Sequence, residues 1–364
     1  MKIHNITNIL EEWAPLSYQE SYDNSGLIVG SLNDNLEGVL VTLDCTEKII
    51  DEAIEKKCNL IIAHHPILFN PLKKLSGDTY VERIIIKAIK NNISIYAIHT
   101  NLDNIIDGVN SSIANKLGLV NCKILQPKYD VLKQLVVYCP KDHVEILRKN
   151  LFKIGAGSIG DYDNCSFSSE GISTFLPKPE SNPFVGEKGV LHKEKEIKLD
   201  LVFPKNIESE ILKCLEDIHP YEEVVYQIVS LNIKFKSVGA GLIGELNESI
   251  DPAKFISSLK IKMNTSCVRY TELIDKKIKT VAVCGGSGSF LLSTAINSPA
   301  DIFISSDFKY HEFFDADNKI IIADIGHFES EQYTKDLIYD FLRKKITKFA
   351  VHLSQVKTNP INYI

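Results

Sequence analysis

The chain has 364 residues, which at roughly 100–200 residues per domain predicts two to three domains. Hydrophobic residues make up 44% and charged residues 24%, the balance of an ordinary globular protein. The formal net charge of −6 argues against a dominant phosphate-binding surface, so we do not expect a nucleic-acid partner. No apolar run approaches the roughly 18 residues of a membrane helix, and no signal-peptide pattern opens the chain. We therefore expect a cytoplasmic protein.

Eight cysteines are scattered along the chain, and none forms a C-x-x-C pair with another. This spacing argues against a zinc ribbon and against a thioredoxin-type redox site. In a reducing cytosol we expect these cysteines to be mostly small buried apolar residues.

The first part of the chain alternates short apolar runs with amphipathic segments. Strands are predicted over 38–43, 59–63 and 93–98, and helices over 46–57 and 79–90. Continuous apolar strands separated by amphipathic helices are typical of βαβ units. They predict a mostly parallel sheet that is covered on both faces.

The pattern changes after residue 127. Strands are predicted over 131–138, 196–203 and 224–231, helices over 141–152 and 207–218, and a long Gly/Ser/Asp-rich segment over 155–189. Strand–helix–strand followed again by strand–helix–strand is the order of a ferredoxin-like, split βαβ α+β module. The sequence therefore predicts an inserted domain over 128–232.

The α/β alternation resumes after this module. Strands are predicted over 279–284, 301–305 and 319–324, and a last helix ends near residue 345. The predicted fold class is α/β. One discontinuous domain, made of 1–127 and 233–364, is interrupted by the ferredoxin-like insert.

Four polar features follow predicted strands of the discontinuous domain. They are His64-His65, His99-x-x-x-Asp103, Ser306-Asp307 with His311, and His327-x-x-x-Glu331. In open α/β sheets, ligands bind at the carboxyl ends of the strands, where loops converge. These features are therefore the candidate site.

The residue types of these features suit divalent metal ions. His327 and Glu331 are four residues apart near a helix start, so they share one helix face. Neutral imidazole with carboxylate suits Zn²⁺, Mn²⁺ or Fe²⁺. His64 and His65 point in opposite directions in extended backbone, so each could serve one of two neighbouring ions. A paired-metal centre with a bridging carboxylate would use these four residues and Asp103. Two simpler interpretations stay open: H-x-x-x-E is common on solvated helices, and Asp103 could cap the following turn.

A glycine-rich segment, Gly285-Gly286-Ser287-Gly288-Ser289, follows the strand 279–284. Free backbone N–H groups of Gly286, Ser287 and Gly288 could bind an anion, although a simple tight turn explains the glycines equally well. The segment lacks the Lys-Ser/Thr of a Walker A loop, and Leu291 stands where a dinucleotide fingerprint requires Gly. At the earlier strand end Asp44-Cys45-Thr46, a helix cap is expected rather than catalysis.

Together these motifs resemble the family of GTP cyclohydrolase I type 2 homologues, also called the NIF-three-like family. The resemblance covers nearly the whole chain. It rests on 22–27 (Tyr-Asp-Asn-Ser-Gly-Leu), 43–46 (Leu-Asp-Cys-Thr), 63–66 (Ala-His-His-Pro), 99–103 (His-Thr-Asn-Leu-Asp), 284–289 (Cys-Gly-Gly-Ser-Gly-Ser), 306–311 (Ser-Asp-Phe-Lys-Tyr-His) and 326–331 (Gly-His-Phe-Glu-Ser-Glu).

The resemblance implies two divalent ions per subunit, with Glu331 as the bridge. The implied ligands are His64, His65, Asp103, His327 and Glu331. Two positions depart from the family pattern, because Tyr22 stands where Trp is usual and Ser306 replaces the usual Gly before Asp307. Neither is a ligand, so they bear on local packing.

The resemblance also implies an assembly. The insert is similar to the PII/CutA-like domain of longer bacterial members, through the motifs at 157–165 and 219–223. Family members form homohexamers of stacked trimers that enclose a cavity, and their inserts are thought to cap its openings. His219 in the second motif is expected to be structural.

These observations favour a metal-dependent hydrolase, in which two ions polarise an electrophile and supply a hydroxide at neutral pH. GTP cyclohydrolase activity is implied by the resemblance alone, and the small-molecule substrate is unknown. His99, close to Asp103 in sequence, is the candidate for supporting a ligand or for acid–base chemistry. The alternative is a metal-binding hexameric assembly or regulatory protein without turnover.

Overall fold

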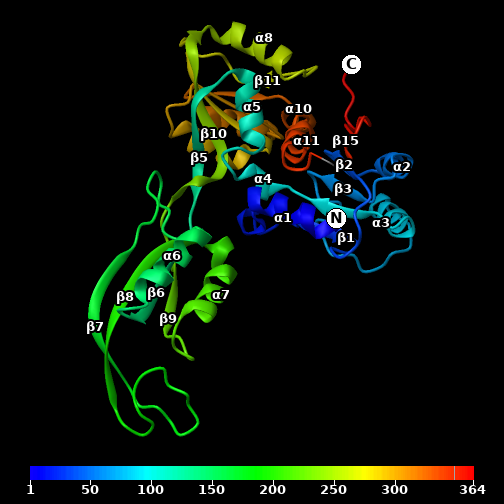
Figure 1. Cartoon of the computed structure of the whole chain (residues 1–364). Helices are drawn as coiled ribbons and strands as arrows, with labels where there is room; N and C mark the ends of the chain where they lie inside the picture. Colours follow the sequence, from blue (N-terminus) through cyan, green and yellow to red (C-terminus); the bar gives the residue numbers. More distant parts are fainter. Residues whose placement is uncertain (348) are drawn as a thin grey trace. The chain divides into compact units, whose positions relative to one another are not determined.

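The computed structural model describes residues 1–347 and 349–364. The chain forms two compact units, one made of Met1–Pro127 with Ser237–Ile364 and the other of Lys128–Lys236 (Figure 1). The second unit is thus inserted into the sequence of the first. The sequence interpretation ended the insert at residue 232, whereas the structure keeps the chain with the insert as far as Lys236.

The larger unit contains a five-stranded sheet in the order β1-β4-β3-β2-β15. Its strands are β1 (Gly26–Val29), β2 (Val39–Thr42), β3 (Leu60–Ala63), β4 (Ser94–Ala97) and β15 (Val351–Leu353). The pairings β15–β2, β2–β3 and β3–β4 are parallel, and β1 pairs antiparallel with β4. Every residue of β2, β3 and β4 is buried, as expected for strands covered on both faces.

Amphipathic helices cover this sheet. They are α1 (Ile3–Trp13), α2 (Glu47–Glu55), α3 (Tyr80–Lys90) and α11 (Thr334–Lys345). Ile49 of α2 and Ile84 of α3 pack with Leu40 and Ile61 in one cluster, which places these two helices on the same face. Helices α1 and α11 contact each other through the stacked rings of Trp13 and Phe341.

A second sheet of the larger unit has six strands in the order β11-β14-β13-β12-β10-β5. The strands are β5 (Val120–Lys128), β10 (Phe235–Ile250), β11 (Arg269–Tyr270), β12 (Ile278–Ser287), β13 (Ile302–Ser306) and β14 (Ile321–Asp324). One face packs on α5 (Val109–Leu117) and α8 (Pro252–Lys262), and the other packs on η3 (Ser289–Leu291), α9 (Leu292–Ile296) and η4 (Tyr310–Ala316).

The prediction of one mostly parallel sheet is wrong in part, because there are two sheets and both are mixed. Antiparallel pairs among the described strands include β1–β4, β10–β12 and β11–β14. Each of these pairs includes a strand that lies outside the predicted strand–helix alternation. Parallel pairing needs a long crossover connection, so it is confined to the strands that such crossovers join.

Several strands of both sheets end near one another. His64 follows β3 and His99 follows β4, while Asp307 follows β13 and His327 begins just after β14. The polar side chains of the candidate site therefore lie at the carboxyl ends of parallel strands, which is the general arrangement of ligand sites in α/β proteins.

The inserted unit forms one antiparallel sheet in the order β7-β8-β6-β9. Its elements in chain order are β6 (Leu132–Pro140), α6 (Val144–Ile154), β7 (Phe167–Phe175), β8 (His192–Pro204), η2 (Lys205–Ile207), α7 (Glu208–Ile218) and β9 (Tyr226–Leu231). Both helices pack with β6 and β8 around one apolar cluster. Strand β7 lies in the segment 155–189 that the sequence interpretation took as irregular, because its residues are mostly polar and exposed.

The C-terminal segment after β15 is tied to the first sheet. Glu52 of α2, 8% exposed, accepts hydrogen bonds from Lys56, from the Ser354 hydroxyl and from the backbone N–H of Gln355. This contact directs the chain end back across the larger unit. In the part of the chain that the structure describes, no helix combines the length and the apolarity that crossing a bilayer requires.

Candidate metal centre

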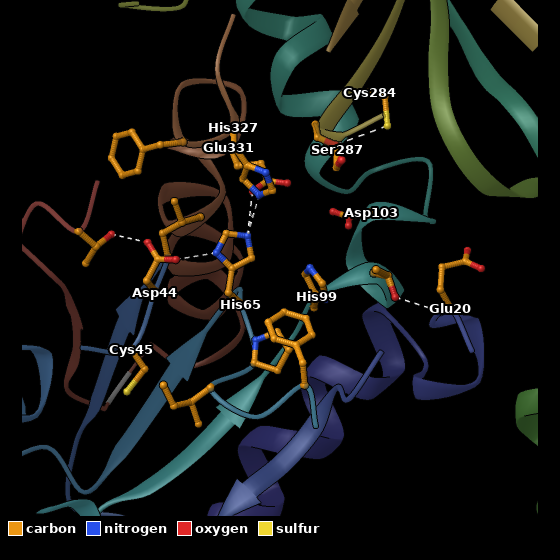
Figure 2. Close-up of a pocket in the computed structure, with 18 of the residues that line it drawn as sticks. Glu20, Asp44, Cys45, His65, His99, Asp103, Cys284, Ser287, His327 and Glu331 are labelled. Carbon is orange, nitrogen blue, oxygen red and sulfur yellow. Dashed lines mark hydrogen bonds and ion pairs between the residues drawn. The ribbon is translucent and has the colours of Figure 1, made fainter. Parts of the chain in front are cut away.

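Six side chains of the larger unit converge in one place. They are His64 and His65 after β3, His99 after β4, Asp103 at the end of α4 (Thr100–Asp103), and His327 and Glu331 at the two ends of α10 (His327–Glu331). Figure 2 shows His65 between Asp44 on one side and His327 with Glu331 on the other.

All four histidines are held through the same ring nitrogen, Nδ1. His64 Nδ1 lies 2.8 Å from the Ile98 carbonyl oxygen, and the other three each contact a carboxylate. The carboxylate pairs are His65–Asp44 at 2.7 Å, His99–Asp23 at 2.8 Å and His327–Asp307 at 2.6 Å. A partner on Nδ1 fixes the ring orientation and directs Nε2 toward the centre, as in metal-ligating histidines generally.

Glu331 belongs to two groups of these side chains, one with His65 and His327 and the other with His64 and Asp103. Its Oε2 lies 2.9 Å from His65 Nε2 and 3.1 Å from His327 Nε2. Its Oε1 lies 3.8 Å from His64 Nε2. The two oxygens of one carboxylate therefore face different imidazoles.

The close approach of Glu331 depends on Gly286. This glycine has φ +62°, and a Cβ atom there would lie 2.3 Å from Glu331 Oε1. Its N–H donates to Ser330 Oγ at 2.9 Å and its carbonyl oxygen accepts from Ser306 Oγ at 2.5 Å. The glycine thus allows the carboxylate to enter, and its backbone is used to fix β12 to β13 and α10.

The anion-binding role suggested for Gly286, Ser287 and Gly288 stays a prediction. The Gly286 N–H already has a protein acceptor, and a Cβ at Gly288 would lie 2.2 Å from Ser305 Oγ, so close packing explains both glycines. Ser287 does line the pocket beside the centre.

Electrostatic attraction holds His65, His327 and Glu331, the first group, together. Burial alone would lower the pKa of His65, but its hydrogen bonds to Asp44 and Glu331 raise it to about 10. The pKa of His327 rises in the same way to about 11, through Asp307 and Glu331. Burial would raise the pKa of Glu331, but the surrounding imidazoles hold it well below its usual range. Without a metal ion, His65 and His327 are therefore protonated at neutral pH.

The second group is formed by His64, Asp103 and Glu331. Two of its polar atoms lack hydrogen-bond partners. Burial raises the pKa of Asp103 to about 7. Its Oδ1 and the Nε2 of His64 are 3.7 Å apart, and both are buried without a hydrogen bond to any described residue. Buried polar atoms are nearly always satisfied, so such a pair points to an ion or another ligand. Because Oδ1 makes no such bond, it does not serve as a cap for the following turn.

The donor set fits divalent metal ions. Three overlapping groups keep their ligand atoms within 4.8 Å of one another: His65–His327–Glu331, His64–Asp103–Glu331 and His64–His65–His99. Imidazole and carboxylate donors suit Zn²⁺, Mn²⁺ and Fe²⁺. His99 belongs to the third group, so its position also suits a ligand, and the supporting or acid–base role expected from the sequence stays a prediction.

The centre borders a cavity of about 680 Å³ in the larger unit, a volume typical of small-molecule sites. His65, His99, Asp103, His327 and Glu331 are among its lining residues. Exposed aromatic side chains also line it, namely Tyr22, Phe69, Tyr80 and Phe290. The C-terminal segment contributes Thr358, Asn359, Pro360 and Ile361.

Comparison with known proteins gives the family. The sequence profile described as Duf34/NIF3 (NGG1p interacting factor 3) matches residues 1–360. The chain belongs to the Duf34/NIF3 family. It is 38% identical over 369 residues to a Bacillus subtilis protein named GTP cyclohydrolase 1 type 2 homolog, covering 99% of this chain and 98% of that protein.

Solved structures similar to this chain agree with this assignment. The crystal structure of a Bacillus cereus protein related to NIF3 is similar with a TM-score of 0.86 at 36% identity, covering 100% of this chain and 99% of that chain. A Staphylococcus aureus protein is similar with a TM-score of 0.78 at 30% identity and the same coverage. The resemblance seen in the sequence is confirmed.

Sequence reasoning assigned no role in the centre to two of the three carboxylates that support the histidines, Asp44 and Asp23, whereas Asp307 was among the candidate features. Asp44 was interpreted as part of a helix cap, but its carboxylate contacts His65 Nδ1 and accepts from Thr358 Oγ1 at 2.5 Å. Thr46 does stand at the N-cap of α2, without a side-chain cap hydrogen bond. Asp23 stands within the motif 22–27, which by itself assigns it no role in the centre. The rule that polar residues at strand ends form the site would have found Asp44, since it follows β2 closely.

Two other positions singled out in the sequence lie apart from the centre or beside it. His311 is exposed on η4 and packs against Tyr310, so it is not brought to the metal groups. Tyr22, the departure from the usual Trp, is 66% exposed and lines the cavity. Ser306, the other departure, is buried and bonds Gly286.

Proposed function

We propose that this protein is a dinuclear-metal-dependent hydrolase that acts on a small molecule. The observation that carries the proposal is Glu331, whose Oε2 faces His65 and His327 and whose Oε1 faces His64, beside a cavity of about 680 Å³. Carboxylates that bridge two ions are typical of hydrolytic dinuclear sites. The names of two relatives also favour a hydrolase, since both are called GTP cyclohydrolase 1 type 2 homolog.

The proposed ligands divide into two sets that share one member. His65, His327 and Glu331 would hold one ion, and His64, Asp103 and Glu331 would hold the other. We place His99 with the second set, because its Nδ1 is held by Asp23 and its ring lies edge-on to His64, with ring centres 5.2 Å apart. Two ions bound there would polarise an electrophilic centre of the substrate and lower the pKa of a water molecule.

The chain itself supplies orientation and substrate contacts. In the metal-bound protein, Asp44, Asp23 and Asp307 would keep three imidazoles in one tautomer, with the proton on Nδ1 and the lone pair of Nε2 toward the centre. The aromatic side chains of Tyr22 and Phe290 offer apolar surface for a flat part of the substrate. Burial and nearby carboxylates raise the pKa of Tyr22 to about 12, so its phenol keeps its proton at neutral pH.

The proposal is tested by turnover. Protein loaded separately with Zn²⁺, Mn²⁺ and Fe²⁺ is offered a panel of nucleotides, cyclic amides and phosphoesters, and the His65→Ala variant is the matched control. We expect one substrate class to be hydrolysed by the metal-loaded wild type and not by the variant. Metal binding with no turnover of any class would support the alternative function, a metal-binding assembly or regulatory protein.

The homohexamer of stacked trimers stays part of the proposal, with the insert as a PII/CutA-like module. What supports it is the sheet of the insert, whose strand β7 carries the exposed apolar side chains Phe167 and Ile172. Strand β7 also forms the edge of that sheet, where its backbone groups could pair with another chain. Light scattering of the full-length protein would give about six times the 40.9 kDa chain mass.

A further inference from the structure

The inserted unit has a cavity of its own, with a volume of about 600 Å³. Tyr138 of β6 and Glu196 of β8 line it, and they alternate with Val137 and Ile197, whose side chains pack in the core with α6 and α7. Successive side chains of a strand point to opposite faces. The cavity therefore lies on the sheet face away from these helices, beneath the connection between β7 and β8, which supplies Pro177 and other lining residues.

This cavity carries unbalanced negative charge. Its lining includes Glu196, Glu222 and Glu223, and none of the described residues that line it is Lys, Arg or His. Glu196 is only 5% exposed and forms no ion pair with any residue that the structure describes. A buried carboxylate without a counter-charge costs free energy, so a bound cation would be favoured there.

Two neighbouring histidines, His219 and His192, leave that charge uncompensated, and a third, His143, lies with its ring edge-on to Phe184, ring centres 5.3 Å apart. Burial lowers the pKa of His219, which therefore stays neutral at neutral pH. His192 is paired with Glu194, its Nε2 lying 2.8 Å from the carboxylate.

Three aromatic rings stand around the same space. The ring centre of Tyr221 lies 6.2 Å from that of Phe175 and 6.3 Å from that of Phe184, at interplanar angles of 58° and 49°. All three rings line the cavity. Inclined rings at such spacing allow one cation to lie within about 6 Å of several ring centres, where the ring faces attract it.

Hydrogen bonds hold this arrangement in place. The carboxylate of Glu222 accepts from the backbone N–H of Asn182 at 2.9 Å, which fixes the β7–β8 connection over the cavity. His219 Nε2 lies 2.9 Å from the Tyr138 carbonyl oxygen, and the Tyr221 N–H donates to His219 Nδ1 at 3.1 Å. His219 thus has the structural role expected from the sequence, and the rings are positioned before any ligand arrives.

We propose that this cavity binds a small organic cation, a substituted ammonium whose alkyl groups contact the rings of Phe175, Phe184 and Tyr221 and whose charge faces Glu196. The site would be separate from the metal centre, since every residue that lines it belongs to the inserted unit. A neutral molecule of the same shape would fill the same space but would leave the carboxylate unmatched.

The test compares choline with 3,3-dimethylbutan-1-ol, its neutral carbon isostere, by isothermal titration calorimetry on the full-length protein. We expect choline to bind at least about tenfold more tightly than the alcohol. Glu196→Gln should weaken choline binding by about tenfold and leave the alcohol unchanged, and Phe184→Leu should weaken choline more than the alcohol. The matched control is Glu187→Gln, an exposed residue of the same connection that does not line the cavity.

Equal affinity for the two ligands would overturn the proposal, and so would wild-type affinity for choline in Glu196→Gln. The absence of saturable choline binding below about 10 mM would also overturn it. The comparison of ligands uses the wild-type protein, so it holds even if a variant fails to fold.

Discussion

Replacing Glu331 by Gln keeps the size of the side chain and removes the charge that two groups of histidines share. In the structure Oε2 lies 2.9 Å from His65 Nε2 and 3.1 Å from His327 Nε2, while Oε1 lies 3.8 Å from His64 Nε2. Side chains that only support a metal ligand contribute roughly 10- to 100-fold to metal affinity. A carboxylate that ligates two ions should contribute more, so we expect the variant to lose at least about 100-fold in affinity for each ion.

The assay is elemental analysis of purified protein, followed by competition with a chelator of known affinity. Wild type should retain about two ions per chain after dialysis, and Glu331→Gln fewer than one. Glu329→Gln is the matched control, because Glu329 is also buried on α10 but accepts from Asn359 Nδ2 at 3.1 Å and contacts no histidine in the described structure. Circular dichroism confirms that both variants fold.

One outcome would refute the bridging role, and a second would remove the support that a loss of metal gives to it. If Glu331→Gln kept two ions per chain, the carboxylate would not ligate either of them. If Glu329→Gln lost metal to the same degree, the loss would reflect general damage to α10 and would say nothing about the bridge.

Three further predictions follow from other contacts of the larger unit. Asp44→Asn should weaken metal binding about 10- to 100-fold, because His65 loses the carboxylate on its Nδ1; unchanged chelator competition would contradict this. In the metal-free protein the pKa values of His65 and His327 are raised to about 10 and about 11. Metal uptake at pH 7.5 should therefore release at least about one proton per chain, and metal affinity should rise with pH. Calorimetry in buffers of different ionisation enthalpy would measure the protons released. Burial would raise the pKa of Glu52, but its contact with Lys56 lowers it, so its stabilisation is present above about pH 4.5 and is lost as the pH falls through the folded-state pKa. Glu52→Gln should therefore lower the free energy of unfolding by about 1–3 kcal/mol at pH 7 and by much less at a pH below both the unfolded and the folded pKa, and equal losses in urea titrations at both pH values would contradict this.

The sequence predicted the strands that are buried on both faces and the residues that end them. The run Leu60–Ala63 is apolar throughout and Ile321–Asp324 is apolar except at its last position, so their burial could be inferred without knowing their neighbours. The polar residues that follow them then had to lie at a sheet edge. For this reason all six residues of the centre can be named from the sequence alone.

The rest depended on contacts between distant parts of the chain. Strand β7 (Phe167–Phe175) has the sequence of a polar loop, and its pairing with β8 gives it its structure. Asp44 looks like a helix cap because the pattern that marks a cap is local, whereas its partner His65 lies 21 residues away and its partner Thr358 lies 314 residues away. Local patterns carry no information about such pairs.

The order of the strands explains how a site divided over so long a chain can form at all. His65 and Glu331 are separated by 266 residues, and the whole inserted unit lies between them. The insert leaves through β5 (Val120–Lys128) and returns through β10 (Phe235–Ile250), and these are neighbouring strands of one sheet. Its two ends are therefore already adjacent. The entropic cost of closing a loop grows only with the logarithm of its length, by about 0.6 kcal/mol per doubling, so the insert adds little to the cost of joining the two segments. The metal centre can then be built by the larger unit, and the inserted unit is free to carry a binding site of its own.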